Sequence, residues 1–313
     1  MYTYFDIVEK FSCEMCGKCC QNAWLVTIDE ASYNRNKLWF DRQGSSEEFK
    51  QAFTIIEADA SPGEYASINK GQNGCWFLEN DKRCRLHKAA GHQHLDAVCQ
   101  TFPRYPMATA RGTDITLSLA CPAVFRLIER EEPLRLIKAD HSPTEVPEDS
   151  YVEQVFPKQK ATYDPLRNYF EIEYHIIDLL QCRAIALPKR LQMVAETVAR
   201  ISGMAGSDSI GSMLNRLFEE NYALLEQSAG GSADHGVTTD VLIEHFLVNL
   251  TFRKVFYSYG LERGSQLLTE FYRQILLAAG AKPEDITRTD KVKAAIKELE
   301  FEFGHNRKAM KQV

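Results

Sequence analysis

A run of eight residues near the N-terminus, Cys13-Glu-Met-Cys16-Gly-Lys-Cys19-Cys20, carries four cysteines, two of them adjacent. At most two residues separate each cysteine from the next, so the four sulfurs can converge on one small centre. This run constrains the fold strongly, because metal binding by such ligands is coupled to folding. We therefore expect the first third of the chain to be a lobe built around a metal centre, and the remainder to be the body that holds it.

Four further cysteines follow this run before residue 122, and only Cys182 lies beyond them. Thiolates bind zinc and iron–sulfur clusters because they are soft donors that neutralise the charge of the metal. The odd total of nine cysteines fits a fully paired disulfide framework poorly. The candidate metal ligands are Cys13, Cys16, Cys19, Cys20, Cys75, Cys84, Cys99 and Cys121.

The sequence leaves the number and type of metal centres open. Eight sulfurs exceed the need of one centre, so either there are two sites or some cysteines are structural. Zinc favours four ligands in a closed tetrahedron, and an iron–sulfur cluster also takes about four thiolates, sometimes in a Cys-Pro pair like that at Cys121. Cys19 and Cys20 are adjacent and tend to point in different directions, so one of them is a candidate bystander. His87 is more typical of an exposed or capping histidine than of a ligand, and Cys182 is expected to be a core thiol.

The composition is that of an ordinary soluble globular protein, with 44% hydrophobic and 26% charged residues. The net charge of −6 argues against a nucleic-acid-binding protein and is compatible with a lysine-bearing protein partner. The N-terminus lacks the basic and apolar regions of a signal peptide. No segment reaches the ~18 uninterrupted apolar residues of a membrane span. We therefore expect a cytoplasmic protein without membrane insertion, in which thiols stay reduced and available to metals.

Short strands, turns and helices are expected around the cysteines. A β-like run over 24–28 precedes an acidic helix start at Asp29, and residues 45–58 have a weakly amphipathic helical pattern. The segment from Cys75 to Cys84 is typical of a hairpin with its turn near Asn80-Asp81, which would bring the two cysteines together. A short helix, a proline-broken stretch and a strand are expected over 85–99, 101–106 and 115–120, respectively.

Beyond residue 163 the hydrophobic period becomes that of helices. Asp164 is a good N-cap with Pro165 at the first helical position, and one apolar face follows. Further helices are expected near 188–202, 208–227, 239–258, 262–279 and 284–308. The fold class is therefore mainly α, a helical C-terminal body with an irregular, cysteine-rich α+β metal-binding lobe at the N-terminus. The predicted domains are a metal-binding lobe, a connecting segment and a helical domain over 1–130, 131–163 and 164–313.

Three cysteine-bearing segments, read together, resemble a cysteine-cluster domain that chelates zinc or iron. They are the Cys-x2-Cys-Gly-x-Cys-Cys run, Gly74-Cys75-Trp-Phe-Leu with Arg83-Cys84-Arg-Leu-His87, and Ala97-Val-Cys99-Gln-Thr-Phe-Pro103-Arg104. Later segments narrow the resemblance to the flagellin lysine-N-methylase family. They are residues 117–128, 176–183 with 187–191, 244–256 and the terminal pair His305-Asn306. The resemblance covers nearly the whole chain.

The resemblance implies a protein-lysine N-methyltransferase that transfers a methyl group from S-adenosylmethionine to lysines of flagellin or another lysine-bearing protein. It also implies an iron–sulfur cluster, expected as 4Fe-4S, although the spacing of the first cysteines is not that of radical-SAM enzymes. No glycine-rich loop after a strand indicates a Rossmann cofactor site, and no catalytic base stands out. Aromatic faces that attract cations are available, each more typical of core, at Phe102, Tyr105, Tyr169, Phe170 and Tyr174. The alternative function is a non-enzymatic zinc- or iron-binding module that contacts a protein partner.

Overall fold

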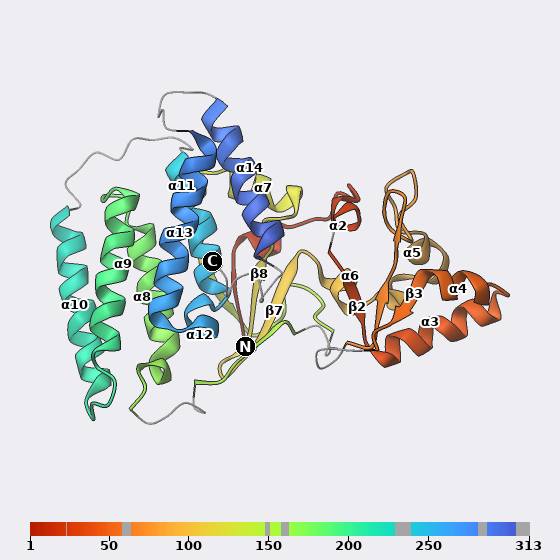
Figure 1. The fold of residues 1–313 in the computed structure, drawn as a ribbon. Coiled ribbons are helices and arrows are strands. Elements are labelled where there is room, and N and C mark those ends of the chain that lie inside the picture. The colour runs from red at the N-terminus through yellow and green to blue at the C-terminus, as the bar shows by residue number, and fades with distance from the viewer. Residues whose placement is uncertain are drawn as a thin grey trace.

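The computed structural model describes residues 1–22, 24–57, 64–147, 151–157, 163–228, 239–280 and 287–304. A helical body and a smaller lobe lie side by side, and the segments around α2 (Lys18–Gln21) and α6 (Ala97–Thr101) lie between them (Figure 1). The C-terminal part is helical and the N-terminal part is a mixture of strands, short helices and cysteine-bearing turns. The expected fold class is therefore confirmed.

A five-stranded sheet lies at the boundary between the body and the lobe (Figure 1). Its strands are β1 (Tyr2–Phe5), β7 (Arg104–Thr109), β8 (Gly112–Leu117), β9 (Leu136–Ala139) and β10 (Glu153–Val155). Their order is β10-β7-β8-β1-β9, in which β7–β8 and β1–β9 are antiparallel and β1–β8 and β10–β7 are parallel. Tyr4 pairs with Ile115 on one side and with Ile137 on the other, so the N-terminal strand is enclosed by two neighbours.

The body is built from helices that pack on this sheet and on one another. They are α1 (Ile7–Lys10), α7 (Pro122–Ile128), the 3-10 turn η3 (Pro165–Asn168), α8 (Tyr169–Gln181), α9 (Leu187–Ser202), α10 (Ile210–Ser228), α11 (Thr239–Phe252), α12 (Val255–Tyr259), α13 (Leu261–Ala279) and α14 (Thr287–Glu302). As expected, the Asp164 carboxylate accepts a hydrogen bond from the backbone N–H of Leu166 (2.8 Å). The helix expected over 239–258 is divided, because Lys254 adopts a left-handed backbone with φ of 72° between α11 and α12.

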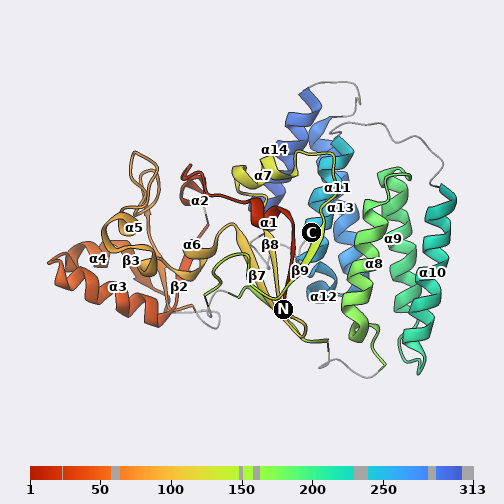
Figure 2. The same cartoon turned by 180° about the vertical axis from the view of Figure 1, so that it is seen from behind.

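Helix α11 lies inside the body, and every residue from Val241 to Phe252 is buried. It packs against α8, α13, α14 and β8. The view from behind shows α8, α9 and α10 on the side of the body that faces away from the lobe (Figure 2). Because α11 has no exposed face in its last three turns, its polar side chains must find partners within the protein.

The lobe has a hydrophobic core of its own, formed mainly by Ile28, Phe40, Phe49, Phe53, Phe77, Leu86 and Leu95. Its elements are β2 (Val26–Ile28), α3 (Glu30–Arg42), α4 (Ser46–Ala52), β3 (Phe53–Ile55), β4 (Ala66–Ile68), β5 (Lys70–Gly71), β6 (Gly74–Cys75), α5 (Arg85–Ala90) and the 3-10 turn η1 (His92–His94). The start of α3 is confirmed, since Asp29 accepts a hydrogen bond from the backbone N–H of Ser32 (2.7 Å).

Two helices expected in the lobe are shorter than the sequence indicates. The helix over 45–58 ends at Ala52, because Phe53–Ile55 pairs instead with β4 in a three-stranded sheet. The helix over 85–99 is divided into α5, η1 and α6, and Gly91 separates the first two with φ of 93°. Both errors come from pairing and turn geometry that helical periodicity does not register.

The larger hydrophobic core joins the sheet to the helices of the body. Phe5 on β1, for example, packs against Phe252 on α11 with ring centroids 4.9 Å apart. Strands β9 and β10 lie within the segment expected to connect the domains, and the domain boundaries at residues 130 and 163 stay a prediction. None of the described helices combines the length and apolar character needed to cross a membrane. The pair His305-Asn306 lies outside the described residues.

Candidate metal centre

Two glycines allow the first cysteine run to pack closely against the segment that carries Cys75. Gly17, which precedes α2, has φ of 70°, and a Cβ atom there would lie 3.0 Å from the carbonyl oxygen of Lys82. Gly74 has φ of 124°, and a Cβ atom there would overlap the carbonyl oxygen of Cys20. Left-handed backbone and close approach both favour glycine. The backbone around α2 therefore lies directly on the turns before and after Cys75.

The segment from Cys75 to Cys84 turns back on itself, as the sequence predicts. Leu78 pairs with Cys84 in an isolated antiparallel bridge. The backbone N–H of Lys82 donates a hydrogen bond to the carbonyl oxygen of Glu79 (2.9 Å) and closes the turn. Two cysteines that are nine positions apart in the sequence are thereby carried on neighbouring backbone segments.

Five thiols gather where α2, this hairpin and α6 meet, and we call them the lobe thiols: Cys19, Cys20, Cys75, Cys84 and Cys99. The sulfur atoms of Cys19 and Cys20 lie 3.9 Å apart. The hydrogen bond between these thiols lowers the pKa of Cys19 to about 7 and raises the pKa of Cys20. Burial raises the pKa values of Cys75 and Cys84, and the negative charge of Cys19 raises both further. The exposed thiol of Cys99 also interacts electrostatically with Cys19, Cys75 and Cys84. The five thiols are therefore close enough to interact electrostatically.

Three other thiols form a second group at the edge of the body, and we call them the boundary thiols: Cys13, Cys16 and Cys121. Cys121 is buried and immediately precedes α7, while Cys13 and Cys16 lie on the chain between α1 and α2. Burial raises the pKa of Cys121, and the charges of Cys16 and Cys13 raise it further. An ion pair between Glu14 and Arg126 ties the cysteine-bearing chain to α7.

The side chain of Arg104 accompanies the boundary thiols. Its guanidinium lies over the ring of Phe11, 5.1 Å from the centroid. Burial lowers the pKa of Arg104, and the nearby charge of Cys13 opposes that shift. Within the described part of the chain, the buried Nε atom of Arg104 has no hydrogen-bond partner. The boundary thiols therefore lie near a cation whose buried Nε–H group has no hydrogen-bond partner among the described residues.

The described thiols lie near one another but do not form a set of metal ligands. Among the described residues, no three His, Cys, Asp or Glu side chains are placed to hold a metal ion as they stand. Cys182 ends α8 in the body and belongs to neither group of thiols. His87 lies on α5 with its ring 5.6 Å from that of His92. The assignment of the eight N-terminal cysteines as ligands stays a prediction.

The five aromatic side chains considered for cation binding hold other partners in the structure. Tyr169 is fully buried, and its hydroxyl donates a hydrogen bond to Glu173 (2.9 Å). Phe170 and Tyr174 cover Arg111, with centroids 4.1 Å and 4.7 Å from its guanidinium carbon. Tyr105 covers Arg253 in the same way at 4.9 Å, and Phe102 packs edge-on against Trp24.

The body contains a buried ion cluster that was not predicted from the sequence, and we call it the central ion cluster: Arg111, Asp114, Glu173 and Lys254. The Lys254 ammonium lies 2.8 Å from Asp114 and 2.9 Å from Glu173, and none of these three side chains is exposed. Arg111 contacts the same two carboxylates at 2.6 Å and 3.2 Å. Burial raises the pKa of Glu173, although Lys254 opposes the shift. The sequence signal that could have predicted this cluster is the presence of charged residues within otherwise apolar segments.

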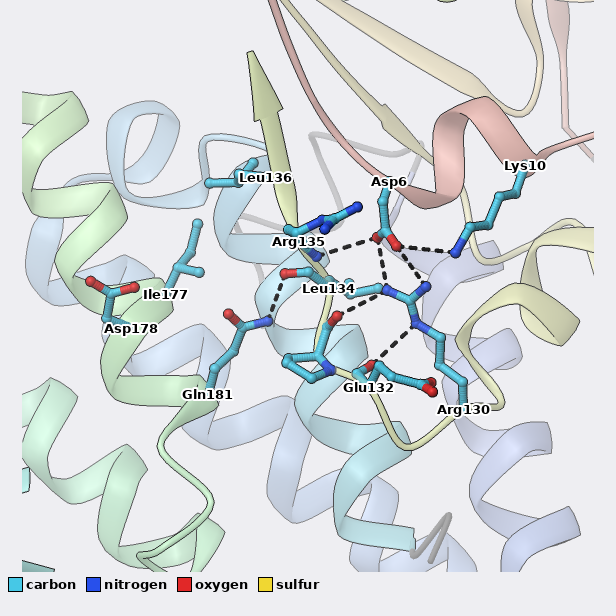
Figure 3. Close-up of a pocket in the computed structure, with 11 residues that line it drawn as sticks. Asp6, Lys10, Arg130, Glu132, Leu134, Arg135, Leu136, Ile177, Asp178 and Gln181 are labelled. Carbon is cyan, nitrogen blue, oxygen red and sulfur yellow. Dashed lines mark hydrogen bonds and ion pairs between the residues drawn. The ribbon is translucent and has the colours of Figure 1, made fainter. Parts of the chain in front are cut away.

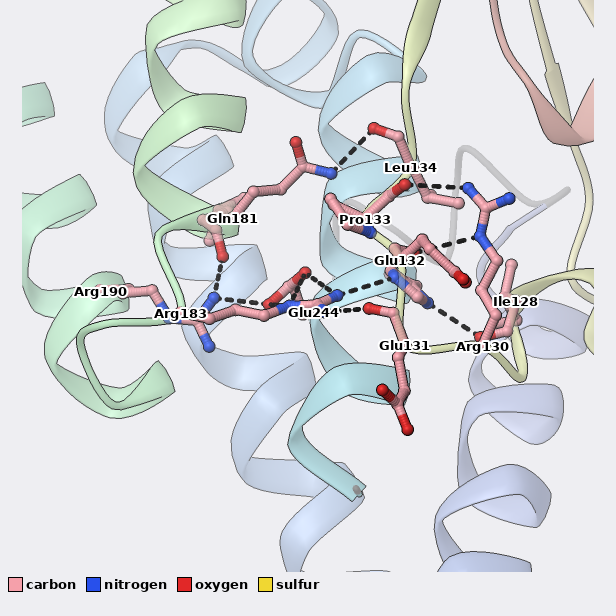
Figure 4. Close-up of polar contacts among 12 residues, drawn as sticks. Ile128, Arg130, Glu131, Glu132, Pro133, Leu134, Gln181, Arg183, Arg190 and Glu244 are labelled. Carbon is pink, nitrogen blue, oxygen red and sulfur yellow. Dashed lines mark hydrogen bonds and ion pairs between the residues drawn. The ribbon is translucent and has the colours of Figure 1, made fainter. Parts of the chain in front are cut away.

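A second buried network fixes the start of α11 against α8 and α9 (Figure 4). Glu244 is fully buried and accepts ion pairs from Arg183 (2.8 Å) and Arg190 (2.7 Å). His245 shares a hydrogen bond between its Nδ1 atom and the carbonyl oxygen of Ile128 (2.9 Å). Glu244 and His245, two polar residues of the segment 244–256, are therefore explained by packing inside the body.

A cavity of about 640 Å³ opens between α1, α8 and the chain before β9 (Figure 3). The Arg130 guanidinium forms a two-pronged ion pair with Asp6 on its wall, with both contacts at 2.7 Å. Burial raises the pKa of Asp6, but hydrogen bonds from Arg130 and from the backbone of Arg135 outweigh this and hold it at about 2. The lining residues are all described and include no cysteine, so the cavity is separate from both groups of thiols.

Comparison with known proteins supports a metal-binding role for the N-terminal part of the chain. Residues 12–122 match the family CxxCxxCC, described as a "Putative zinc- or iron-chelating domain". This range contains both groups of thiols and excludes Cys182. Over nearly its whole length, the chain is similar to lysine-N-methylases. The lysine-N-methylase of Salmonella typhimurium strain LT2 is 26% identical over 293 residues, which cover 91% of this chain and 68% of that protein.

Two more relatives extend the comparison. The lysine-N-methylase of Salmonella choleraesuis strain SC-B67 gives the same identity and coverage. The flagellar biosynthetic protein FliU of Salmonella muenchen is 26% identical over 119 residues, which cover 37% of this chain and 70% of that protein. No solved structure matches the chain. The resemblance predicted from the sequence is confirmed as a similarity to these relatives.

The donor set fits a zinc ion or an iron–sulfur cluster. Nine free cysteines are present, eight of them inside the matched range, and thiolate is the donor that both metals accept. The lobe thiols alone meet the need of about four ligands. Metal binding by such thiols is coupled to folding, because a preformed site rarely exists in the unfolded chain.

Proposed function

We propose that this protein is a protein-lysine N-methyltransferase that uses S-adenosylmethionine, contains an iron–sulfur cluster and acts on flagellin in the cytoplasm. The observation that supports this most strongly is the similarity to lysine-N-methylases over 91% of the chain. The similarity to FliU supports a flagellar substrate. The free thiols support a reducing compartment, where cysteines stay available to metals.

The reaction moves one methyl group between two substrates. The lysine nitrogen forms a bond to the methyl carbon, the bond from that carbon to sulfur breaks, and the products are methyl-lysine and S-adenosylhomocysteine. Lysine attacks only as the neutral amine, so one proton must leave to water or to a protein base. A thiolate-held iron–sulfur cluster supplies a Lewis-acidic or redox-active centre when it is bound.

The chain's own contribution is to hold the lobe on the body. The indole N–H of Trp24 donates a hydrogen bond to the carbonyl oxygen of Phe301 on α14 (3.0 Å), and the two rings pack with centroids 5.0 Å apart. Trp24 also meets Phe102, which follows α6. The thiols thereby keep a fixed place relative to the helices, as positioned catalysis requires.

The test begins with anaerobic purification, metal and sulfide analysis, and an absorption spectrum. We expect iron and sulfide in equal amounts, about four of each per cluster, and a brown colour from iron–thiolate and iron–sulfide bonds. Purified flagellin is then incubated with S-adenosylmethionine labelled in its methyl group, and labelled lysine is located by mass spectrometry. Cys182→Ser is the matched control, because its thiol lies outside the matched range.

The outcomes separate the proposed function from its alternative. Label on flagellin lysines that is lost in Cys99→Ser and kept in Cys182→Ser supports the methyltransferase. Stoichiometric zinc without sulfide, together with no label on flagellin, would overturn the proposal in favour of a zinc-binding module that contacts a partner.

A further inference from the structure

The cavity between α1, α8 and the chain before β9 has no part in the proposed function. Its volume of about 640 Å³ lies within the range of about 300–1,000 Å³ that is typical of sites for small molecules. No cysteine lines it, so it is separate from the candidate metal centre. The charges and the apolar side chains of its walls decide what it can bind.

Three cationic side chains gather on one wall, and we call them the cavity cations: Lys10, Arg130 and Arg135. They lie around the buried carboxylate of Asp6 (Figure 3). The other two carboxylates of the lining lie away from this group, and one of them, that of Asp178, accepts a hydrogen bond from Tyr222 on α10 (2.6 Å). Three cations around one carboxylate leave this wall with an excess of positive charge.

Asp6 holds two of the cavity cations in place. It forms the two-pronged ion pair with Arg130 and a longer contact with Lys10 (3.3 Å). Arg130 also donates hydrogen bonds to two backbone carbonyl oxygens of the loop that follows it, so most of its donors are occupied. These contacts fix two positive charges on the wall before any ligand arrives.

The guanidinium of Arg135 differs from the other two cations. Its backbone N–H donates a hydrogen bond to Asp6 (3.3 Å), whereas no carboxylate among the residues that the structure describes forms an ion pair with its side chain. A guanidinium carries five N–H donors and no acceptor. Arg135 therefore presents its donors to the cavity beside two fixed positive charges.

Much of the remaining lining is apolar, and we call these side chains the apolar floor: Leu134, Leu136 and Ile177. Leu134 and Ile177 are buried, and Leu136 is half-buried. The carbonyl oxygen of Leu134 accepts a hydrogen bond from the side chain of Gln181 on α8 (2.9 Å), which holds the floor against that helix. The cavity thus combines a cationic wall with an apolar surface.

We propose that this cavity binds a small organic anion, with its carboxylate or phosphate group at the cavity cations and its apolar body on the apolar floor. The fork of N–H donors of a guanidinium matches the oxygen atoms of both groups. A wall with an excess of one charge also concentrates ligands of the opposite charge. Acetate or inorganic phosphate would use the cations alone, whereas an organic anion uses both parts of the cavity.

Ligands with one alkyl chain and different head groups test the sign of the charge. Octanoate, octyl phosphate, octanamide and octylamine are each titrated into the full chain by isothermal titration calorimetry, below the concentrations at which they form micelles. At least one of the two anions is expected to bind about tenfold more tightly than octanamide, because charge-assisted hydrogen bonds are stronger than neutral ones. Octylamine should bind most weakly. Tighter binding of octanoate assigns a carboxylate ligand, and tighter binding of octyl phosphate assigns a phosphate ester.

Shorter anions test the apolar floor. Acetate and inorganic phosphate should bind more weakly than octanoate and octyl phosphate, because each buried methylene group strengthens binding by up to about fourfold. Equal affinity of acetate and octanoate would remove the floor from the site.

Arg135→Gln tests the cation without an ion pair. The side chain is exposed and the backbone N–H that contacts Asp6 is kept, so the body should stay folded by far-UV circular dichroism. Binding of the preferred anion should weaken about tenfold. Arg135→Lys should weaken it less, because the charge is kept. The matched control is Lys189→Gln, an exposed cation on α9 outside the cavity, which should bind the anion like the wild type.

Three results would overturn the site. They are saturable binding of neither anion, binding of octanamide or octylamine as tight as that of both anions, and unchanged binding of the anion in folded Arg135→Gln. All titrations are made without S-adenosylmethionine and without flagellin. A failure here is therefore distinguishable from a failure of the proposed function.

Discussion

Replacing Lys254 by methionine should destabilise the body strongly. In the native protein the central ion cluster contains two cations and two carboxylates, so its charges balance. Lys254→Met leaves Arg111 alone with Asp114 and Glu173, and these two carboxylates have no exposed surface. Breaking a buried ion pair by removing one partner costs about 3–5 kcal/mol, because the other charge stays buried. Methionine has a similar length and the same left-handed backbone penalty as lysine, so the measured cost reports on the charge.

The pH dependence of this cost follows from Glu173. Burial already raises its pKa above the usual value, and the loss of Lys254 must raise it further. A carboxyl group with a raised pKa in the folded state binds its proton more tightly when folded, so lowering the pH favours the folded form. The stability deficit of Lys254→Met should therefore be largest near neutral pH and shrink as the pH falls toward the pKa of the buried carboxyl.

Urea unfolding at several pH values, followed by far-UV circular dichroism, is the appropriate assay. The helices of the body dominate that signal, whereas all three tryptophans lie in or next to the lobe, at Trp24, Trp39 and Trp76. The urea midpoint measured by tryptophan fluorescence should therefore shift less than the midpoint measured by circular dichroism. The melting temperature should fall by about 10 °C, since each kcal/mol is worth about 2–4 °C at this size. The matched control is Lys189→Met on α9, an exposed residue, which should stay within about 0.5 kcal/mol of the wild type.

A second substitution tests whether unbalanced charge is the cause. Lys254→Met/Glu173→Gln restores the balance, because Arg111 then faces Asp114 alone. The double variant should be more stable than Lys254→Met by at least about 1 kcal/mol, although each single change is destabilising. A deficit below about 1 kcal/mol for Lys254→Met, or a double variant in which the two costs simply add, would refute the reasoning.

Three other predictions concern separate contacts. Asp6→Asn removes the ion pair with Arg130 and should lower the free energy of unfolding by about 1–2 kcal/mol at neutral pH. The native pKa of Asp6, about 2, lies below its value in the unfolded chain, so this difference from the wild type should vanish as the pH falls from 4 to 2. Urea titrations at a series of pH values measure it. Trp24→Ala removes the hydrogen bond to Phe301 and should expose the boundary to limited proteolysis at least tenfold faster, and unchanged cleavage would show that the lobe is held elsewhere. Cys182→Ser should leave the metal content unchanged, because Cys182 follows α8 in the body. A measured loss of metal would contradict the location of the metal site among the N-terminal cysteines.

Elements defined by local chemistry were predictable from the sequence. The N-cap at Asp164 and the helices beyond it follow from capping and the 3.6-residue period, and the structure confirms them. The break between α11 and α12 was not predictable, because a lysine with positive φ has no sequence signature. The buried positions of Glu244 and Lys254 were also missed, because a periodicity argument assigns charged residues to exposed faces. Helix α11, which carries Glu244, has no exposed face in its buried turns, and Lys254 follows it in the break before α12.

The candidate site was predictable in its residue types and not in its grouping. The clustering of cysteines by itself indicates a metal centre, because few other constraints place so many thiols together in a reducing compartment. Which thiols come close together depends on long-range packing. Cys121 lies near Cys13 and Cys16 because α7 follows β8 in the sheet that also contains β1, and β1 leads through α1 into the cysteine run. Spacing along the sequence cannot encode a pairing between strands that are about 110 residues apart.

The first cysteine run lies on the chain that leads from the body into the lobe. Cys13 and Cys16 follow α1, Cys19 and Cys20 lie on α2, and Glu14 forms an ion pair with Arg126 on α7. Metal binding by such thiols is coupled to folding, so a metal held there stabilises the fold of the lobe. Loss of the metal should therefore loosen the lobe, including the contact of Trp24 with Phe301, and leave the helical body folded.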